Sequence, residues 1–316
     1  MRMRACLLIV GLVAALLVPV PGKAKQTRRC GGYRVTKTGT PGDDVIRGTR
    51  KNDVIAGLAG DDRITGRGKG DVICGGKGND VLHGNNKADS LYGGGGDDSL
   101  FAGKQKVRQG RCDDTGGGPA APAACAFLWD VLAGGPGADV LIGSPSPDSL
   151  HGGNGDDRIV GKNREDSIDG DGGDDVVRAG PGNDSITFTS APRPVRVSLA
   201  EGRAAGWGRD VLQSVENVSG SVYSDVLVGD EHDNSLYAIE DGLSEGGDDV
   251  LRGRRGEDYM FGFGGADDMY GGRGDDFMNG DDTKDRPGPD RLFGGAGTDR
   301  CFYGEHYEAC EKRAGE

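Results

Sequence analysis

The sequence predicts an all-β fold, a solenoid whose short strands recur along the chain. An aspartate returns every nine residues, without a slip, over two stretches of the sequence. Two residues after each aspartate stands an aliphatic residue, as Ile64 and Leu82 illustrate. A fixed period of this kind dictates the whole architecture, because each repeat becomes one unit of a stacked array. The periodic aspartates are Asp44, Asp53, Asp62, Asp71, Asp80, Asp89 and Asp98, then Asp130, Asp139, Asp148, Asp157, Asp166, Asp175 and Asp184.

Residues 75–83 show the unit clearly, with Gly75, Gly76 and Gly78 before Asp80 and Leu82. Glycine adopts backbone angles forbidden to other residues, so the Gly-rich segment predicts a tight turn with exposed carbonyl oxygens. The next three residues fit a very short strand whose middle side chain points inward. Nine residues then form half a coil. Carboxylate and carbonyl oxygens gathered at a turn are the ligands that hard cations such as calcium prefer.

This pattern resembles the hemolysin-type (RTX) calcium-binding repeat, glycine-glycine-x-glycine-x-aspartate-x-apolar-x. One nonapeptide would be weak evidence, but the resemblance extends over most of the chain. It implies a parallel β-roll, a right-handed solenoid of nonapeptide repeats in which calcium lies between successive turns on the same edge. Inserted loops and a disulfide-capped C-terminus complete the expected fold.

The period also divides the chain into segments. Val195, Val197 and Leu199 alternate before a Glu-Gly turn, which predicts a strand bridge where the period is broken. Solenoids need caps, because an open end exposes a strand edge. The expected segments are a signal peptide at 1–24, an N-terminal lead at 25–38, array 1 at 39–101, a loop insertion at 102–124, array 2 at 125–187, the strand bridge at 188–219, array 3 at 220–302 and a C-terminal cap at 303–316.

The first 24 residues are typical of a secretory signal peptide, since Arg2 and Arg4 precede an apolar run and small residues follow it. The alternative is an uncleaved membrane anchor, although the run is shorter than the ~20 residues of a span. No other segment of the sequence could cross a membrane. We therefore expect a secreted, extracellular protein with no membrane span in the mature chain.

Cysteine usage agrees with export. Apart from Cys6 in the leader, the cysteines are even in number, which suggests disulfides in a secreted chain. Paired Cys-x-x-Cys spacing, typical of zinc sites, is missing. The expected pairs are Cys112–Cys125 across the insertion, Cys301–Cys310 at the C-terminal end, and Cys30–Cys74 by elimination.

Composition limits both the core and the partners. Only 34% of the residues are hydrophobic, so one inward residue per nine leaves a thin core. Metal ligation that exists only in the folded state would stabilise that state. The net charge of −13 argues against nucleic-acid binding. Because the acids are placed periodically, they indicate cations as the partners.

The fourth position of the unit carries a second period. In array 1 glycine alternates there with Lys51, Lys69 and Lys87, and array 2 continues the alternation less strictly. Since two units complete a coil, the good turns fall on one edge, and the other edge is expected to hold little or no calcium over residues 39–178. The lysines either neutralise Asp53, Asp71 and Asp89 in place of metal or decorate a solvated turn.

The predicted calcium ligands are therefore aspartates of good turns that lie eighteen residues apart. In array 3 glycine-type turns follow one another directly, so both edges are expected to bind. Asp290 and Asp299 follow a slip in spacing, and Asn234 replaces the expected aspartate, so these three are not assigned. The assigned residues are Asp44, Asp62, Asp80, Asp98, Asp139, Asp157, Asp175, Asp249, Asp258, Asp267 and Asp276.

The sequence offers no catalytic constellation. Four histidines form no His-Glu-x-x-His, and neither a Gly-x-Ser-x-Gly elbow nor a phosphate loop is present. Paired acids such as Asp97-Asp98 belong to the turns. We expect a secreted calcium-binding protein that is not an enzyme.

Aromatic residues mark one other surface of the predicted roll. Tyr259, Phe261 and Phe277 occupy outward positions expected on one sheet. They could bind a cell-surface or glycan partner, or be covered by the strand bridge or the C-terminal tail. The alternative function is accordingly a calcium-dependent adhesion or matrix protein.

Overall fold

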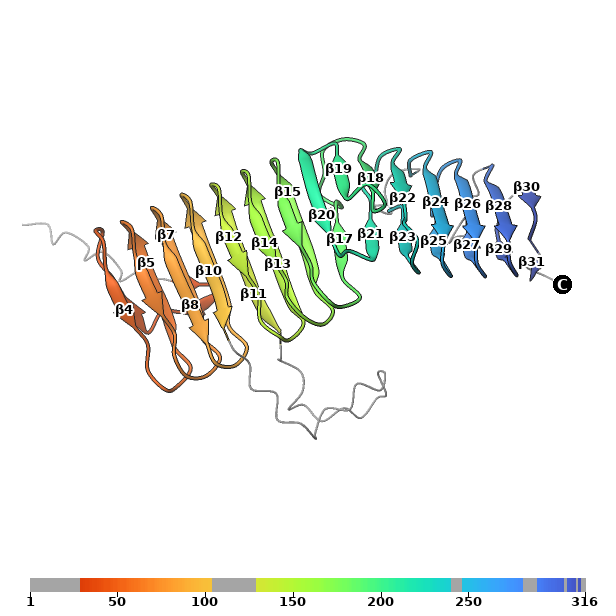
Figure 1. Ribbon diagram of the computed structural model, residues 1–316. Coiled ribbons are helices and arrows are strands. Elements are labelled where there is room, and N and C mark those ends of the chain that lie inside the picture. The colour runs from red at the N-terminus through yellow and green to blue at the C-terminus, as the bar shows by residue number, and fades with distance from the viewer. Residues whose placement is uncertain are drawn as a thin grey trace, which may run out of the picture.

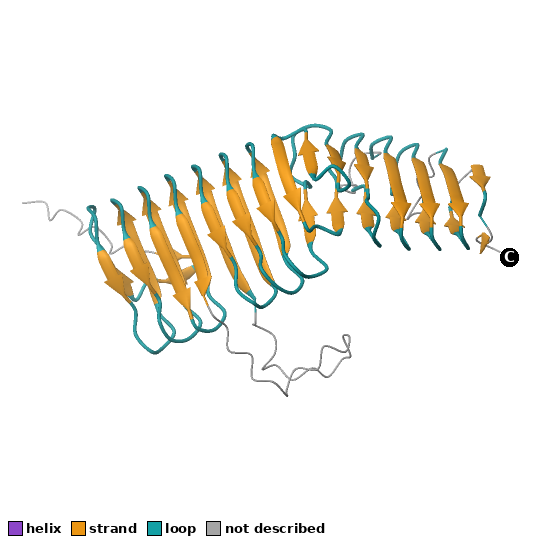
Figure 2. Cartoon of the chain, in the orientation of Figure 1, coloured by secondary structure: helices purple, strands orange, loops and turns teal. Residues whose placement is uncertain are grey.

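The computed structural model describes residues 29–103, 129–239, 246–280, 289–303, 306–310 and 312–313. The described residues contain no helix, and they form two long sheets and one small hairpin. Strands stack side by side along the length of an elongated molecule (Figure 1), and turns join the strands of one sheet to those of the other (Figure 2). The expected signal peptide and the Cys112–Cys125 pair lie outside the described residues.

The two long sheets divide the strands between them, and β1 (Arg29–Cys30) and β2 (Tyr33–Arg34) form the hairpin. The fifteen-stranded sheet contains, in spatial order, β4 (Val45–Arg47), β6 (Arg63–Thr65), β8 (Val81–Asn85), β10 (Ser99–Gly103), β12 (Val140–Ile142), β14 (Arg158–Val160), β16 (Val176–Arg178), β20 (Arg209–Gln213), β19 (Arg203–Ala205), β18 (Arg196–Ser198), β22 (Val226–Val228), β24 (Val250–Arg255), β26 (Asp268–Arg273), β28 (Arg291–Ala296) and β30 (His306–Glu308). The fourteen-stranded sheet contains β3 (Lys37–Thr38), β5 (Val54–Ala59), β7 (Val72–Lys77), β9 (Ser90–Gly95), β11 (Asp130–Pro136), β13 (Asp148–Asn154), β15 (Ser167–Gly172), β17 (Ser185–Thr187), β21 (Asn217–Ser219), β23 (Ser235–Tyr237), β25 (Tyr259–Phe261), β27 (Phe277–Asn279), β29 (Arg300–Phe302) and β31 (Lys312–Arg313).

The strand register confirms that nine residues make half a coil. In the fifteen-stranded sheet Ile64 pairs with Leu82, and in the fourteen-stranded sheet Ile73 pairs with Leu91. Each pair lies eighteen residues apart and is parallel, so consecutive units alternate between the two sheets. The predicted parallel β-roll is therefore confirmed.

The core is a double column of inward side chains between the sheets. Each unit contributes the aliphatic residue two positions after its aspartate, and array 3 contributes Met260, Met269 and Met278, all fully buried. Burying one such side chain contributes about 1.5–3 kcal/mol. A roll with one core residue per nine therefore has little hydrophobic free energy to offset the entropy of ordering its turns.

The interruptions in the period leave the roll continuous. Leu91 pairs with Leu132 and Leu100 with Leu141, so arrays 1 and 2 form one stack across the insertion. The predicted strand bridge contains an antiparallel meander, β18–β19–β20. Its outer strands pair in parallel with β22 and β16, which carries the fifteen-stranded sheet into array 3.

Disulfides fasten both ends of the roll. Cys30, in the N-terminal hairpin, is bonded to Cys74 on β7, and Cys301 is bonded to Cys310. Cys301 occupies the fully buried inward position that the repeat predicts. Both expected pairs, and the disulfide-capped C-terminus, are confirmed. In the part of the chain that the structure describes, no helix is long and apolar enough to span a membrane.

Candidate metal centre

The repeated aspartate ends the turn of each unit and ties that turn to the preceding coil. The backbone N–H of Asp62 donates to Asp80 Oδ1 at 2.8 Å, and that of Asp80 donates to Asp98 Oδ1 at 2.7 Å. The same bond recurs along both sides of the roll. We name the turns that lead into the fifteen-stranded sheet edge one and those that lead into the fourteen-stranded sheet edge two.

A second hydrogen bond at the fifth position clamps many of the same turns in the opposite sense. The backbone N–H of Asp61 donates to Asp43 Oδ1, and the N–H of Asn79 donates to Asp61 Oδ1, both at 2.8 Å. Each coil therefore accepts a hydrogen bond from the preceding coil through its sixth-position carboxylate. It also donates a backbone N–H to the fifth-position side chain of that coil. This reciprocal bonding fixes the spacing between coils and uses Oδ1 of the repeated aspartate, while its other oxygen takes no part.

The second carboxylate oxygen, Oδ2, is buried at most turns. A buried carboxylate oxygen with no donor costs free energy unless an ion or donor compensates it. Among the described residues, Oδ2 has no hydrogen-bond partner in Asp62, Asp71, Asp80, Asp89, Asp98, Asp139, Asp157, Asp166, Asp175, Asp184, Asp258 and Asp276.

The first glycine of the unit makes room for this oxygen. A Cβ on Gly57 would lie 2.1 Å from Asp62 Oδ2 and 2.6 Å from the Gly75 carbonyl oxygen of the next coil. A Cβ on Gly134 would meet Asp139 Oδ2 at 2.2 Å and the Gly152 carbonyl at 2.6 Å. Carboxylate and carbonyl oxygens from adjacent coils thus converge where a side chain is missing. That donor set suits calcium, which takes six to eight oxygens in flexible geometry.

Burial also makes these carboxylates reluctant to ionise without a cation. Desolvation raises the pKa of Asp80 to about 6, that of Asp98 to about 7 and that of Asp175 to about 8. Hydrogen bonds from the backbone oppose the shift, and the carboxylates of adjacent coils add to it. A metal ion between the coils would favour the ionised form, because an opposite charge lowers a carboxyl pKa.

The structure brings the predicted ligands together in columns. On edge one, Asp98 N–H donates to Asp139 Oδ1 across the insertion, so arrays 1 and 2 share one column. In array 3 Asp249 bonds to Asp267 on edge one, and Asp258 bonds to Asp276 on edge two. The edge-one column of predicted ligands comprises Asp44, Asp62, Asp80, Asp98, Asp139, Asp157 and Asp175.

Residues outside the period extend both columns. Asp175 N–H donates to Asp210 Oδ1 and Asp184 N–H donates to Glu216 Oε2, so two acids of the strand bridge take the place of repeat aspartates. Asp290 and Asp299, which the spacing left unassigned, accept from Asp267 and Asp276. The sequence held no periodic signal for Asp210 or Glu216, because Asp210 lies within the β18–β19–β20 meander and Glu216 follows it.

In four of the turns, a Thr or Ser at the second position of the unit donates hydrogen bonds to the carboxylate of the repeated aspartate. Thr40 donates to Asp44 Oδ2 through its N–H at 2.6 Å and its hydroxyl at 3.0 Å. The same arrangement joins Thr49 to Asp53. In the pairs Ser144–Asp148 and Ser221–Asp225 the backbone N–H donates to Oδ2 and the hydroxyl to Oδ1. Asp44 is thus the predicted ligand whose carboxylate is most engaged by its own turn. A Ser or Thr at the second position was the available sequence signal.

Of the two roles considered for the fourth-position lysines, the structure favours the solvated turn over the neutralisation of aspartates. Lys51, Lys69 and Lys87 are exposed and, among the described residues, form no ion pair with the repeated aspartates. A different lysine does reach into edge two. Lys162, at the second position of its unit, donates from Nζ to the Gly143 carbonyl oxygen. Burial lowers its pKa, against the attraction of Asp148 and Asp130.

A parallel roll with buried carboxylate and carbonyl oxygens stacked at its turns defines a repeat protein that binds metal through those turns. The model of the RTX calcium-binding nonapeptide repeat matches residues 38–73, 75–105, 133–163, 151–186, 244–278 and 285–305, more than half of the chain. The chain belongs to this family, and its repeats are calcium-binding. A search of curated proteins finds no match.

Proposed function

We propose that this protein is a secreted β-roll that calcium orders outside the cell, and that it carries no catalytic domain. The observation that carries the proposal is the repeated buried Oδ2 beside a carbonyl oxygen of the next coil, a position that a hard cation completes. Two disulfides support an oxidising compartment. Millimolar extracellular calcium suffices for weak sites that stay empty inside cells.

We assign calcium to edge one through Asp62, Asp80, Asp98, Asp139, Asp157 and Asp175, with Asp44 at its N-terminal end, and in array 3 to both edges. The backbone at the fourth position favours this assignment. Gly78, Gly96 and Gly155 on edge one have φ between +112° and +132°, whereas Lys87 and Arg164 on edge two have φ near +75°. In array 3 Gly265 on edge one and Gly274 on edge two share the glycine-type angle.

The first experiment is a calcium titration of the purified chain from a chelated start, followed by far-ultraviolet circular dichroism with magnesium as the control. We expect a cooperative gain of β signal with calcium alone, because ligation that exists only in the folded state stabilises it. A chain already folded in chelator, and unchanged by calcium, would contradict the proposal.

A matched pair of variants then tests the assignment of edges. Asp80→Asn on edge one should lower the number of bound calcium ions measured by isothermal titration calorimetry. Asp71→Asn on edge two should leave that number unchanged, although both aspartates carry a buried Oδ2 without a partner among the described residues. Equal losses in the two variants would place calcium on both edges of array 1.

A second candidate function is calcium-dependent adhesion through an aromatic surface. Tyr259 stacks on Phe277 at 5.6 Å and Phe261 on Tyr237 at 5.3 Å, on the outward face of the fourteen-stranded sheet. Tyr259 remains 52% exposed, which favours a surface open to a partner. Cell-wall or glycan fractions should retain the calcium-loaded chain and release the Phe261→Ser, Phe277→Ser double variant. If that variant loses calcium-dependent folding as well, the rings are structural and the adhesion function falls.

A further inference from the structure

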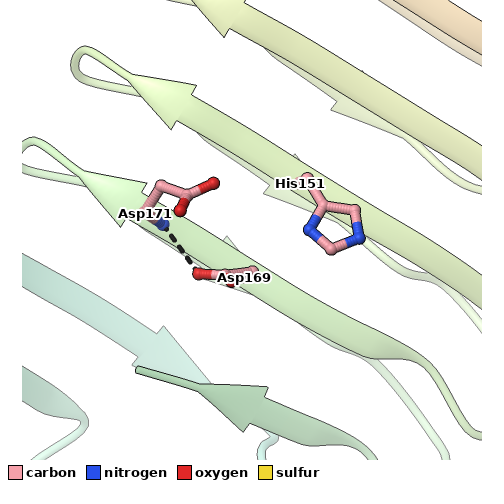
Figure 3. A group of neighbouring side chains, drawn as sticks. All are labelled: His151, Asp169 and Asp171. Carbon is pink, nitrogen blue, oxygen red and sulfur yellow. Dashed lines mark hydrogen bonds between the residues drawn. The ribbon is translucent and has the colours of Figure 1, made fainter. Parts of the chain in front are cut away.

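A histidine and two aspartates gather on the outward face of the fourteen-stranded sheet, away from the sixth position that carries the repeated aspartates. The parallel register of β13 and β15 places His151 beside Asp169 and Gly153 beside Asp171. One ligand atom from each of the three side chains lies within 4.8 Å of the other two. Figure 3 shows the imidazole on one strand facing the two carboxylates on the next.

The imidazole is oriented by a neighbour on its own strand. Ser149 Oγ lies 3.1 Å from His151 Nε2, so Nδ1 is the nitrogen left to face the carboxylates. Such a hydrogen bond to the far ring nitrogen is the usual way in which a ligating histidine is held. Side chains two residues apart on a strand share a face, so Ser149 and His151 lie on the same side of the sheet. The imidazole can therefore contact Ser149 through one nitrogen while the other faces Asp169.

The two carboxylates crowd negative charge into a sheltered position. Asp169 is only 7% exposed, and its Oδ1 accepts the backbone N–H of Asp171 at 3.0 Å. Burial and then the charge of Asp171 raise the pKa of Asp169 to about 6, while His151 acts in the opposite direction. In the described part of the chain, neither carboxylate forms an ion pair with a lysine or arginine. A cation would relieve this repulsion.

We propose that His151, Asp169 and Asp171 bind a divalent transition metal ion, with zinc as the representative ion. One imidazole nitrogen and two carboxylates form a mixed donor set that suits zinc, cobalt or nickel, whereas calcium takes oxygen ligands alone. Three protein ligands leave a coordination position for water. Tetrahedral bonds of about 2.0–2.2 Å place ligand atoms about 3.4 Å apart, so side chains whose ligand atoms lie within 4.8 Å of one another must close by up to about 1.4 Å.

Asp171 also lies close enough to edge one to raise the pKa of Asp157. In the rival assignment, Asp171 instead contributes to calcium binding at the neighbouring turn, and His151 is not a metal ligand. The two assignments differ in whether excess calcium competes with the transition metal and in whether His151 is needed. Both differences can be measured on the calcium-loaded chain.

Trp207 provides an optical signal beside the site. Its indole packs on Gly172, the residue after Asp171, since a Cβ on Gly172 would lie 2.7 Å from Trp207 Nε1. The chain has one other tryptophan, Trp129, which is 60% exposed and can be replaced by phenylalanine. Cobalt quenches nearby tryptophan fluorescence, so the Trp129→Phe chain reports binding through Trp207.

The experiment titrates cobalt into the full Trp129→Phe chain at saturating calcium, with zinc as the competitor. We expect saturable quenching at one cobalt per chain, reversed by zinc and unaffected by more calcium. His151→Gln and Asp169→Asn should each weaken cobalt binding about tenfold or more. The matched control is His83→Gln, because His83 holds the equivalent outward position on β8 and stacks on Phe101 instead.

Displacement of cobalt by calcium, or unchanged binding in His151→Gln, would overturn the proposal. Circular dichroism in calcium shows whether each variant folds. If Asp169→Asn does not fold, Asp171→Asn replaces it, because Asp171 is less buried. Unchanged cobalt affinity in a folded Asp171→Asn chain would likewise overturn the three-residue site.

Discussion

The two edges of the roll carry the same aspartates but different turns. Over array 1 and most of array 2, both edges form the Oδ1 hydrogen bonds between coils, and both bury an Oδ2 without a partner among the described residues. They differ at the fourth position. Edge one has glycine at φ of +100° or more, as in Gly60 and Gly137. Edge two has Lys69 or Ser146 at ordinary angles, or a non-glycine residue near +75°. The comparison teaches that the aspartate builds the coil, while the backbone of the turn distinguishes the edges.

The physical reason is the column of carbonyl oxygens on edge one. A Cβ on Gly78 would lie 2.5 Å from the Gly60 carbonyl oxygen, and a Cβ on Gly137 would lie 1.8 Å from that of Gly96. The fourth-position glycines therefore let the backbone of one coil approach a carbonyl oxygen of the coil before it. Main-chain carbonyl oxygens and carboxylates are the oxygen donors that calcium takes.

The largest expected effect is a pH dependence of the stability of the metal-free roll, and it arises from the buried carboxylates of both edges. Burial raises the pKa of Asp89 and Asp166 on edge two to about 8, and that of Asp157 on edge one to about 7, from an ordinary 3.8. A raised carboxyl pKa gives stability that is present below about pH 4 and is lost as the pH rises through the folded-state pKa.

We therefore expect the fraction folded in chelator, followed by circular dichroism, to be higher at pH 5 than at pH 8. In saturating calcium the fraction folded should instead be higher at pH 8 than at pH 5, because the ion binds the deprotonated carboxylates and protons compete with it. Equal folding at the two pH values without metal would show that the buried carboxylates ionise freely, and the case for a cation between the coils would weaken.

The next effect separates the edges by their turns. Gly78→Ala on edge one places a methyl group against the Gly60 carbonyl at a φ of +112°, which should cost about 2–3 kcal/mol of unfolding free energy. The matched control is Lys69→Ala on edge two, at the same position of the unit. Lys69 is exposed, so its replacement should change stability by no more than about 0.5 kcal/mol. Urea unfolding in saturating calcium measures both, and equal losses would remove the distinction between the turns.

Much of the roll follows from periodicity alone. The nine-residue spacing placed Leu82, Leu91 and Met269 in the core, because a fixed period sets both the strand and the side that faces inward. The columns of aspartates follow for the same reason. Asp210 and Glu216 escaped prediction, since the β18–β19–β20 meander interrupts the nine-residue period and leaves no spacing to count.

Side-chain direction was the other limit of the sequence. Lysines at the fourth position looked suited to neutralise an aspartate, but a turn that projects them into water gives them no reason to fold back. Lys162 stands two positions earlier in its unit, is partly buried, and donates from Nζ to the Gly143 carbonyl oxygen. Only the three-dimensional path of the turn separates these cases.

The smallest expected effect tests whether Lys162 or the backbone of the turn keeps calcium from edge two near Asp148. Lys162→Met removes the donor to the Gly143 carbonyl and should destabilise the chain by about 1 kcal/mol in urea unfolding, whereas Lys69→Met at an exposed turn should not. The calorimetric calcium count should stay the same, because Ser144 still occupies Asp148 and Arg164 still replaces the fourth-position glycine. A count that rises by one would instead identify the ammonium group as the barrier. Calcium would then be excluded from this part of edge two by an internal cation, and the backbone of the turn would be secondary.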